Sequence, residues 1–199
     1  MRLDLTIRSS GPLLLALSAS IGSVRLASAQ KERLSEMKVV RLTNGSNVVD
    51  LDGDKRPDLI VMAWLENNNA HGYNLFTFYI QNQANTQHPL NLVVFADSSG
   101  VASDGFRTSQ GADCVLSDLR LLQPRMGPDL LVIGRRDFGE SYADSLPVTF
   151  TVYRLGIQDE GIPGVPPFQF VPERTIRSRA RFCDVNDAFR AELGLAGDR

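Results

Sequence analysis

The sequence predicts an all-β protein, an antiparallel β-sandwich with short terminal α-helices. Apolar side chains recur mostly at every second position, which is the period of a half-buried strand. Turns rich in Gly, Asn, Ser and Pro separate these runs, and helical periodicity is confined to the two ends of the chain. Strands of this number and spacing are typical of a sandwich or a barrel.

The predicted strands are short apolar runs between polar turns. The clearest is the segment 148–153, where Val148, Phe150 and Val152 alternate with Thr and Tyr side chains. The segment 73–81 alternates in the same way and should pack one side inward. The complete set of predicted strands is 37–42, 59–65, 73–81, 90–95, 129–133 and 148–153.

Helices are predicted at residues 30–38 and 184–193. The first is short, charged and weakly amphipathic. In the second, Asp184 or Asn186 can cap the first amide groups, and Gly194 ends the helix. Its apolar residues recur at intervals of four and form one face: Val185, Phe189 and Leu193.

The first 29 residues have the pattern of a secretory signal peptide. Basic side chains precede a short apolar core at 12–19, and Ala27-Ser28-Ala29 provides a small-residue cleavage site before Gln30. The alternative is an N-terminal helix that stays attached. No segment approaches the ~20 apolar residues of a membrane helix. We therefore expect residues 30–199 to be a single periplasmic β-sandwich domain with a C-terminal helix.

The charge balance argues against nucleic-acid binding. Removing residues 1–29 takes away three of the 21 basic side chains and one of the 23 acidic ones, so the net charge moves from −2 to about −4. A nucleic-acid groove requires clustered Lys and Arg and a high pI. The exported chain is mildly acidic instead.

Two cysteines, Cys114 and Cys183, are the whole complement of the chain. A disulfide is the default for an even pair in an exported protein. It would close a loop of roughly 70 residues and stabilise the fold by about 4 kcal/mol on the chain-entropy model. The alternative is two buried thiols. A disulfide would fasten the C-terminal helix to the region around Cys114.

The segment 50–59 has the ligand spacing of a calcium loop. Asp50, Asp52, Asp54 and Asp58 occupy loop positions 1, 3, 5 and 9, and Arg56 at position 7 would contribute its backbone carbonyl. Four like charges so close repel one another without a cation, so a bound Ca²⁺ would also stabilise the local fold. The alternative is a polar Asp/Gly turn without metal.

The loop departs from an EF-hand in two respects. An EF-hand requires Gly at position 6, where this chain has Lys55, and Gly53 comes two residues early. Pro57 and a β-rich run follow, which predicts a strand after the loop and not a helix. The motif resembles the Asp-rich loops of β-propeller repeats, but a single copy excludes that fold.

Hydrolytic machinery is not evident in the sequence. Ser35-x-x-Lys38 matches the penicillin-recognising motif but lacks its companion motifs. His71 and His88 have no partners at metal-ligand spacing, and no Gly-x-Ser-x-Gly elbow is found. Arg135, Arg136 and Asp137 could clamp a carboxylate or form an ordinary ion pair. The sequence predicts a protein that is not an enzyme.

Three segments together resemble the carbapenem intrinsic resistance proteins, the CarG-like family. They are 50–54, 66–73 with Phe78-Tyr79, and 182–189 with Glu192-Leu193-Gly194. The resemblance implies an exported homodimer that protects against carbapenem without evident hydrolysis. It also implies a β-sandwich related to periplasmic inhibitors of invertebrate-type lysozyme, and a cation site that falls on Asp50, Asp52, Asp54 and Asp58.

We therefore expect a non-catalytic periplasmic protein that confers carbapenem tolerance by binding either the drug or a cell-wall target. The alternative is an inhibitor of invertebrate-type lysozyme. Such inhibitors use a loop with Ser-Gly and a nearby Tyr, and this chain offers residues 138–142, although Gly139 precedes Ser141. A surface turn explains the same residues. A third hypothesis is a calcium-stabilised adhesion or scaffold module.

Overall fold

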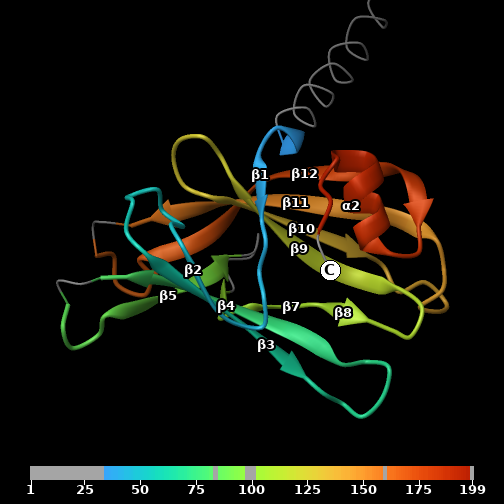
Figure 1. Ribbon diagram of the computed structural model, residues 1–199, viewed down its shortest axis with the longest axis horizontal. Helices are drawn as coiled ribbons and strands as arrows, with labels where there is room; N and C mark the ends of the chain where they lie inside the picture. The colour runs from blue at the N-terminus through green and yellow to red at the C-terminus, as the bar shows by residue number, and fades with distance from the viewer. Residues whose placement is uncertain (1–33, 83–84, 97–101, 159–160, 198–199) are drawn as a thin grey trace, which may run out of the picture.

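The computed structural model describes residues 34–82, 85–96, 102–158 and 161–197 (Figure 1). The predicted signal peptide, residues 1–29, lies outside the described residues, as do residues 30–33 of the predicted first helix. Within the described part of that segment only Leu34 and Ser35 are helical, and a strand already begins at Lys38.

The described chain consists mainly of strands, and one helix follows them. The strands are β1 (Lys38–Val40), β2 (Gly45–Val49), β3 (Asp58–Leu65), β4 (Tyr73–Gln81), β5 (Leu90–Ala96), β6 (Ala102–Ser103), β7 (Phe106–Arg107), β8 (Ser109–Gln110), β9 (Val115–Gln123), β10 (Leu130–Arg136), β11 (Leu146–Ile157) and β12 (Phe168–Phe182). The helix is α2 (Val185–Leu193). The predicted all-β class is confirmed.

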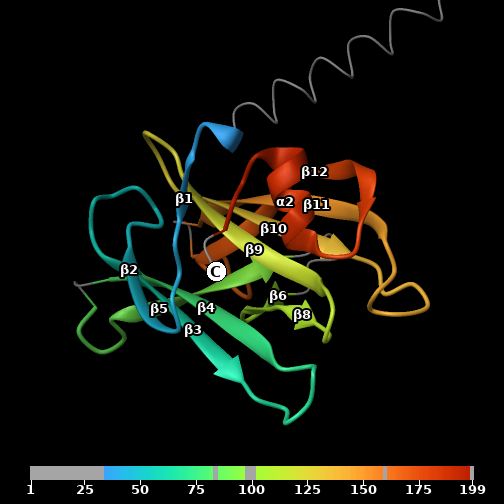
Figure 2. The ribbon, with the colours of Figure 1, turned by 45° about the vertical axis from the view of Figure 1, so that its right-hand side comes forward.

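The strands form one curled, open sheet in which the order is β1-β9-β10-β11-β12-β5-β4-β3-β2. This continuous pairing differs from the predicted sandwich of two separate sheets. The two halves face each other, but β12 and β5 join them through the parallel pairs Gln169↔Val94 and Phe170↔Phe95. All the other strand pairs are antiparallel. Figures 1 and 2 show the curl, with β2–β5 below and β9–β12 above.

The concave side of the curled sheet encloses the larger core. Phe76, Phe78 and Ile80 of β4 are at most 5% exposed, as their alternation predicts. They meet side chains of the opposite half, including Leu121 of β9 and Phe170 of β12. The rings of Phe78 and Phe170 pack edge to face with their centroids 5.1 Å apart. Each half of the sheet therefore buries the other.

A second core lies between the convex side of β9–β11 and helix α2 (Figure 2). Val148, Phe150 and Val152 of β11 are fully buried there and not in the larger core. Phe189 of α2 packs on Phe150, with ring centroids 5.0 Å apart. A Cβ atom on Gly134 of β10 would lie 2.8 Å from the Phe189 ring, so only glycine allows this close approach.

The predicted ends of α2 are confirmed, and so is the disulfide. Asp184 accepts a hydrogen bond from the amide of Asn186 at 2.7 Å, and Gly194 ends the helix with a φ of 69°. Cys114 and Cys183 are joined, with 5.7 Å between their Cα atoms. The second oxygen of Asp184 accepts from the amide of Val115 at 3.1 Å. The start of α2 is thus fastened twice to the start of β9.

Two long strands, β9 and β12, do not appear among the predicted ones. β9 is buried along almost its whole length because the larger core lies on one side and α2 on the other, so its sequence does not alternate. β12 carries many charged side chains and Pro172, which lies where the pairing with β11 shifts its register. No helix in the described residues is long and apolar enough to cross a membrane.

Gly134→Ala should lower the free energy of unfolding by about 1–3 kcal/mol, because the added methyl group overpacks the contact with Phe189. Gly156→Ala is the matched control in β11, since its Cβ would meet the Val171 side chain at 3.3 Å and the Gln169 carbonyl at 3.5 Å, both farther away than the Phe189 ring is from the Cβ at position 134. Urea unfolding measures both changes. Equal stability of the two variants would contradict the close approach of α2 to β10.

Candidate functional site

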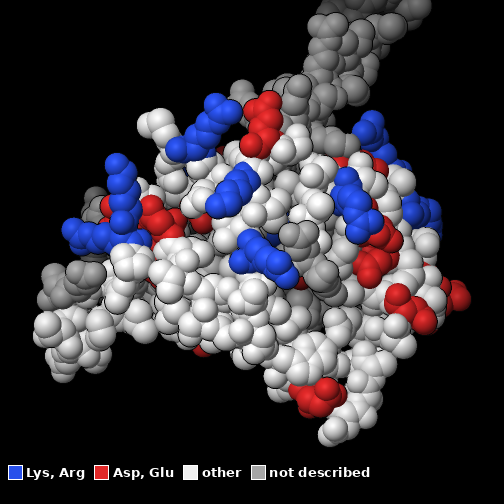
Figure 3. Space-filling model, viewed as in Figure 1, with Lys and Arg blue, Asp and Glu red and all other residues white. Residues whose placement is uncertain are grey.

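The acidic loop, residues 50–58, connects β2 and β3 at one end of the sheet. Side chains of both charge signs lie together at this position on the face shown in Figure 3. Leu51 anchors the loop, because its side chain is 1% exposed and belongs to the larger core. The loop passes directly into β3, so the predicted strand after the acidic residues is confirmed.

Three of the predicted ligand side chains converge. Asp50, Asp52 and Asp58 each offer an oxygen atom, and these atoms all lie within 4.8 Å of one another. Backbone amides orient the carboxylates: Asp50 accepts from Gly53 and Lys55 at 2.9 and 3.0 Å. Each carboxylate oxygen has two lone pairs, so an oxygen that accepts an amide can still bind a cation.

Asp58 fixes the loop to the neighbouring strands. Its two oxygens accept from the amides of Leu51 and Gln81, both at 2.9 Å. Burial raises the pKa of Asp58 in spite of these hydrogen bonds, and burial likewise raises the pKa of Asp52. The negative charge of the neighbouring carboxylates also disfavours ionisation of both groups.

Asp54 is placed differently from the other three predicted carboxylates. Asp54 is not in the group of converging carboxylates. It accepts the amide of Arg56 at 2.7 Å, and its other oxygen lies 3.6 Å from the Arg56 guanidinium. The proposed role of the Arg56 backbone carbonyl stays a prediction.

The backbone of the loop resembles a calcium loop more closely than its sequence does. Lys55 occupies position 6, where an EF-hand requires Gly, and it adopts a φ of 69°. This left-handed conformation is uncommon for a side chain larger than glycine, and such strain tends to persist at functional sites. Gly53 has a φ of 80°, and its Cβ would lie 2.7 Å from the backbone of Gly127. The loop therefore packs tightly against the β9–β10 connection.

Asp129, directly before β10, is a further acidic residue at this site and lies outside the ligand set predicted from the sequence. It is 1% exposed, and its amide donates to the carbonyl of Leu51 at 2.9 Å. Asp129 and Asp50 line the same hollow of about 950 Å³. Its Oδ2 atom is buried and has no hydrogen-bond partner among the described residues. In the sequence, the pattern Gly-Pro-Asp before a buried strand was the signal that could have pointed to Asp129.

These groups fit a hard divalent cation. Burial, followed by the charges of Asp50 and Asp58, raises the pKa of Asp129 to about 7. An unpartnered buried carboxylate is costly unless it is protonated, paired or bound to a metal. Calcium prefers carboxylate and carbonyl oxygens in sites of flexible geometry. Three converging carboxylates and the neighbouring Asp129 would satisfy these preferences.

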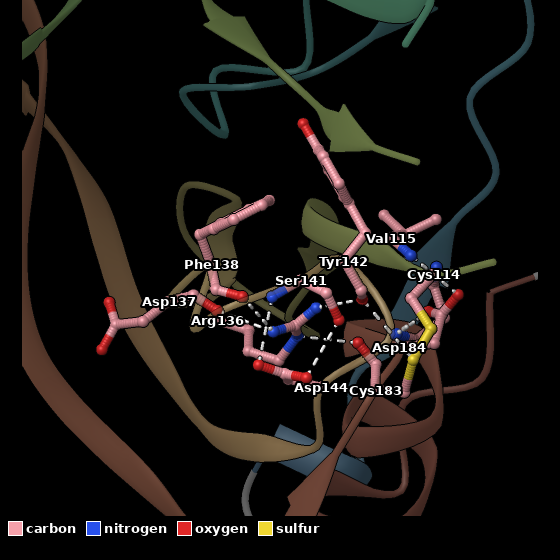
Figure 4. Close-up of a disulfide and its surroundings, with 11 residues drawn as sticks. Cys114, Val115, Arg136, Asp137, Phe138, Ser141, Tyr142, Asp144, Cys183 and Asp184 are labelled. Carbon is pink, nitrogen blue, oxygen red and sulfur yellow. Dashed lines mark hydrogen bonds between the residues drawn. A yellow bond between two sulfur atoms is a disulfide. The ribbon is translucent and has the colours of Figure 1, made fainter. Parts of the chain in front are cut away.

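Arg136, the second residue of the segment 135–137, holds two separate backbone segments together. It is 5% exposed and donates to the carbonyls of Asp137, Phe138, Tyr142 and Cys183 at 2.5–3.2 Å (Figure 4). Its guanidinium thus joins the loop after β10 to Cys183, which precedes the Asp184 cap of α2. Arg136 serves neither as a free carboxylate clamp nor in an ion pair with Asp137 within the described residues.

The loop 138–142, weighed for lysozyme inhibition, is folded upon itself. The Asp144 carboxylate accepts from the Ser141 hydroxyl at 2.9 Å and from the amide of Glu140 at 2.7 Å. These hydrogen bonds hold the pKa of Asp144 below its usual value. The Tyr142 ring packs against those of Phe138 and His71, with centroids 4.9 and 4.7 Å away.

The fold is similar to one solved structure, described as the crystal structure of CarG. The similarity has a TM-score of 0.67 at 24% sequence identity and covers 82% of this chain and 100% of that one. At this level of identity the similarity demonstrates the fold alone. No curated protein matches the chain.

A family model described as carbapenem resistance protein CarG-like matches residues 42–191. The match covers most of the chain, from the segment before β2 into α2. The resemblance found in the sequence is thereby confirmed. This chain belongs to the CarG-like family of carbapenem resistance proteins.

Proposed function

We propose that this protein confers carbapenem tolerance by binding, without hydrolysis, after export to the periplasm. The observation that carries the proposal is the family match over residues 42–191. The disulfide between Cys114 and Cys183 supports export, because such bonds persist in oxidising compartments. The bound species is the drug or a cell-wall component that the protein shields, and the working form is a homodimer.

The acidic loop has a structural role in this proposal. A Ca²⁺ ion held by Asp50, Asp52 and Asp58, with Asp129 beside them, neutralises the negative charge between the loop and the β9–β10 connection. These two segments belong to opposite halves of the curled sheet. The ion therefore stabilises the closure of the larger core and takes no part in a chemical step.

Expression in a susceptible strain should raise the minimal inhibitory concentration of a carbapenem. A form that lacks residues 1–29 should give no increase, because it stays in the cytoplasm. Growth in graded drug concentrations measures both. Tolerance from the retained form would contradict the periplasmic site of action, and catalytic loss of the β-lactam chromophore with the purified protein would contradict a non-catalytic mechanism.

Calcium should stabilise the purified protein, by about 2.7 kcal/mol at a concentration one hundred times its Kd. Asp52→Asn should abolish most of this effect because it removes a converging carboxylate. Asp54→Asn is the matched control in the same loop and should keep the effect, since Asp54 is outside the group. Thermal unfolding with CaCl₂ or EDTA measures both. Loss of the effect in both variants would favour the ligand set predicted from spacing, and an undiminished effect in Asp52→Asn would contradict a site that includes Asp52.

Without metal, the free energy of unfolding should fall as the pH rises from about 4 to about 7. The pKa of Asp129 is about 7 in the folded protein, compared with an ordinary value of 3.8, so the folded protein binds the proton more tightly across this interval. In Asp129→Asn, the fall in the free energy of unfolding between these two pH values should be smaller by on the order of 2 kcal/mol. Urea unfolding in EDTA at several pH values measures it. An unchanged slope in the variant would contradict the assignment.

The lysozyme-inhibitor hypothesis predicts stoichiometric inhibition of an invertebrate-type lysozyme that is lost in Tyr142→Ala. Ser141 already donates its hydroxyl to Asp144 within its own loop. The carbapenem hypothesis is therefore the better supported of the two. A calcium-stabilised scaffold would respond in neither the drug assay nor the lysozyme assay.

A further inference from the structure

A cleft of about 740 Å³ lies between β7, β8, β10 and the loop after β10, away from the acidic loop. Its volume is in the range of small-molecule sites. Thr108 and Ser117 are buried polar residues in its lining, and Phe106 is a buried apolar one. The lining thus combines apolar surface with a few polar groups.

Two arginines line this cleft with their guanidinium groups available. Arg107 lies over the ring of Tyr73 at 5.6 Å, and Arg135 lies over the ring of Phe106 at 5.7 Å. Neither guanidinium has a hydrogen bond or an ion pair within the described residues. A guanidinium stacked on a ring keeps its planar set of donors free for a carboxylate.

The carboxylate in the lining, that of Asp137, does not neutralise these arginines. Asp137 forms no ion pair within the described residues, and its carboxylate points away from Tyr142 in Figure 4. Arg136 also lines the cleft, but its donors are used by backbone carbonyls. The positive charge offered to a ligand therefore comes from Arg107 and Arg135.

A rigid aromatic wall lies beside the arginines. The Tyr142 ring packs edge to face against Phe138 and at a tilt against His71. It also rests on Gly111, whose Cβ would lie 2.7 Å from the ring. The backbone of Tyr142 is held by Arg136, and its carbonyl lies 3.7 Å from the sulfur of Cys183. Such a wall provides apolar contact area at little conformational cost.

We propose that this cleft binds a small organic carboxylate, with Arg107 and Arg135 holding the carboxylate and the Tyr142 wall contacting the rest of the molecule. The inference rests on the proposed function, because it assigns a place to the binding step. Two sources share this chemistry: the carboxylate of a carbapenem, and the terminal carboxylate of a cell-wall stem peptide.

Calorimetry on the purified exported protein tests the inference with three probes. They are meropenem, its methyl ester, and diacetyl-L-Lys-D-Ala-D-Ala. We expect saturable binding of meropenem or of the peptide, and weaker binding of the ester than of meropenem if the drug binds. Binding of the peptide alone would assign the cleft to the wall component. Absence of binding by both acids, or equal binding of meropenem and its ester, would overturn the inference.

Arg107→Gln and Arg135→Gln should each weaken binding about tenfold or more, because each removes a charge-assisted hydrogen-bond donor. Arg190→Gln is the matched control, an exposed arginine of α2 that pairs with Asp187 outside the cleft. All three side chains are exposed, and thermal unfolding verifies that the variants fold. Equal affinities in the cleft variants and the control would overturn the assignment.

Susceptibility measurements on the same variants separate this inference from the proposed function. If the wild-type protein raises tolerance and the cleft variants do so equally, the cleft inference fails while the proposed function stands. If the wild-type protein binds a probe through the arginines but raises no tolerance, the proposed function fails while the cleft remains a carboxylate site.

Discussion

The burial of β9 and β10 on both faces is the constraint on which the rest of the structure depends. One face closes the larger core against β3, β4, β5 and β7, and the other supports α2. Leu121 and Leu122 are adjacent in β9 and fully buried in different cores. The disulfide and the Asp184 cap keep α2 on its face, so the two cores are formed by the same strands and depend on each other.

The two candidate sites lie where parts of this fold meet. At the acidic loop, β2–β3 meets the β9–β10 connection. Several carboxylates come together there with a buried oxygen of Asp129 that has no hydrogen-bond partner in the part of the chain that the structure describes. At the cleft, β7 and β8 meet β10, and two arginines line the same hollow as a group of aromatic rings. The first arrangement suits a hard cation with a structural role. The second suits an organic anion, which connects a binding function to the family to which the chain belongs.

Prediction from the sequence succeeded where a local pattern decides the structure. The alternation in residues 73–81 and 148–153 identified strands, and Asp184 and Gly194 identified the ends of α2. It failed for β9 because a strand buried on both faces loses its alternation. It failed for β12 because its many charged side chains and Pro172 conceal a long strand. The assignment of a two-sheet sandwich missed the junction of β12 with β5, a short parallel pairing of segments distant in sequence.

The sequence by itself determined the all-β class, the helix that ends at Gly194, the cysteine pair and the acidic loop, because each follows from neighbouring residues or from composition. The tertiary structure decided which residues make up the two candidate sites. Asp54 points toward Arg56 and leaves the converging group, while Asp129 joins the loop from 71 residues beyond Asp58 in the chain. Arg107 and Arg135 share a cleft only because the sheet curls. Contacts between distant segments carry no local pattern, so only the folded chain reveals them.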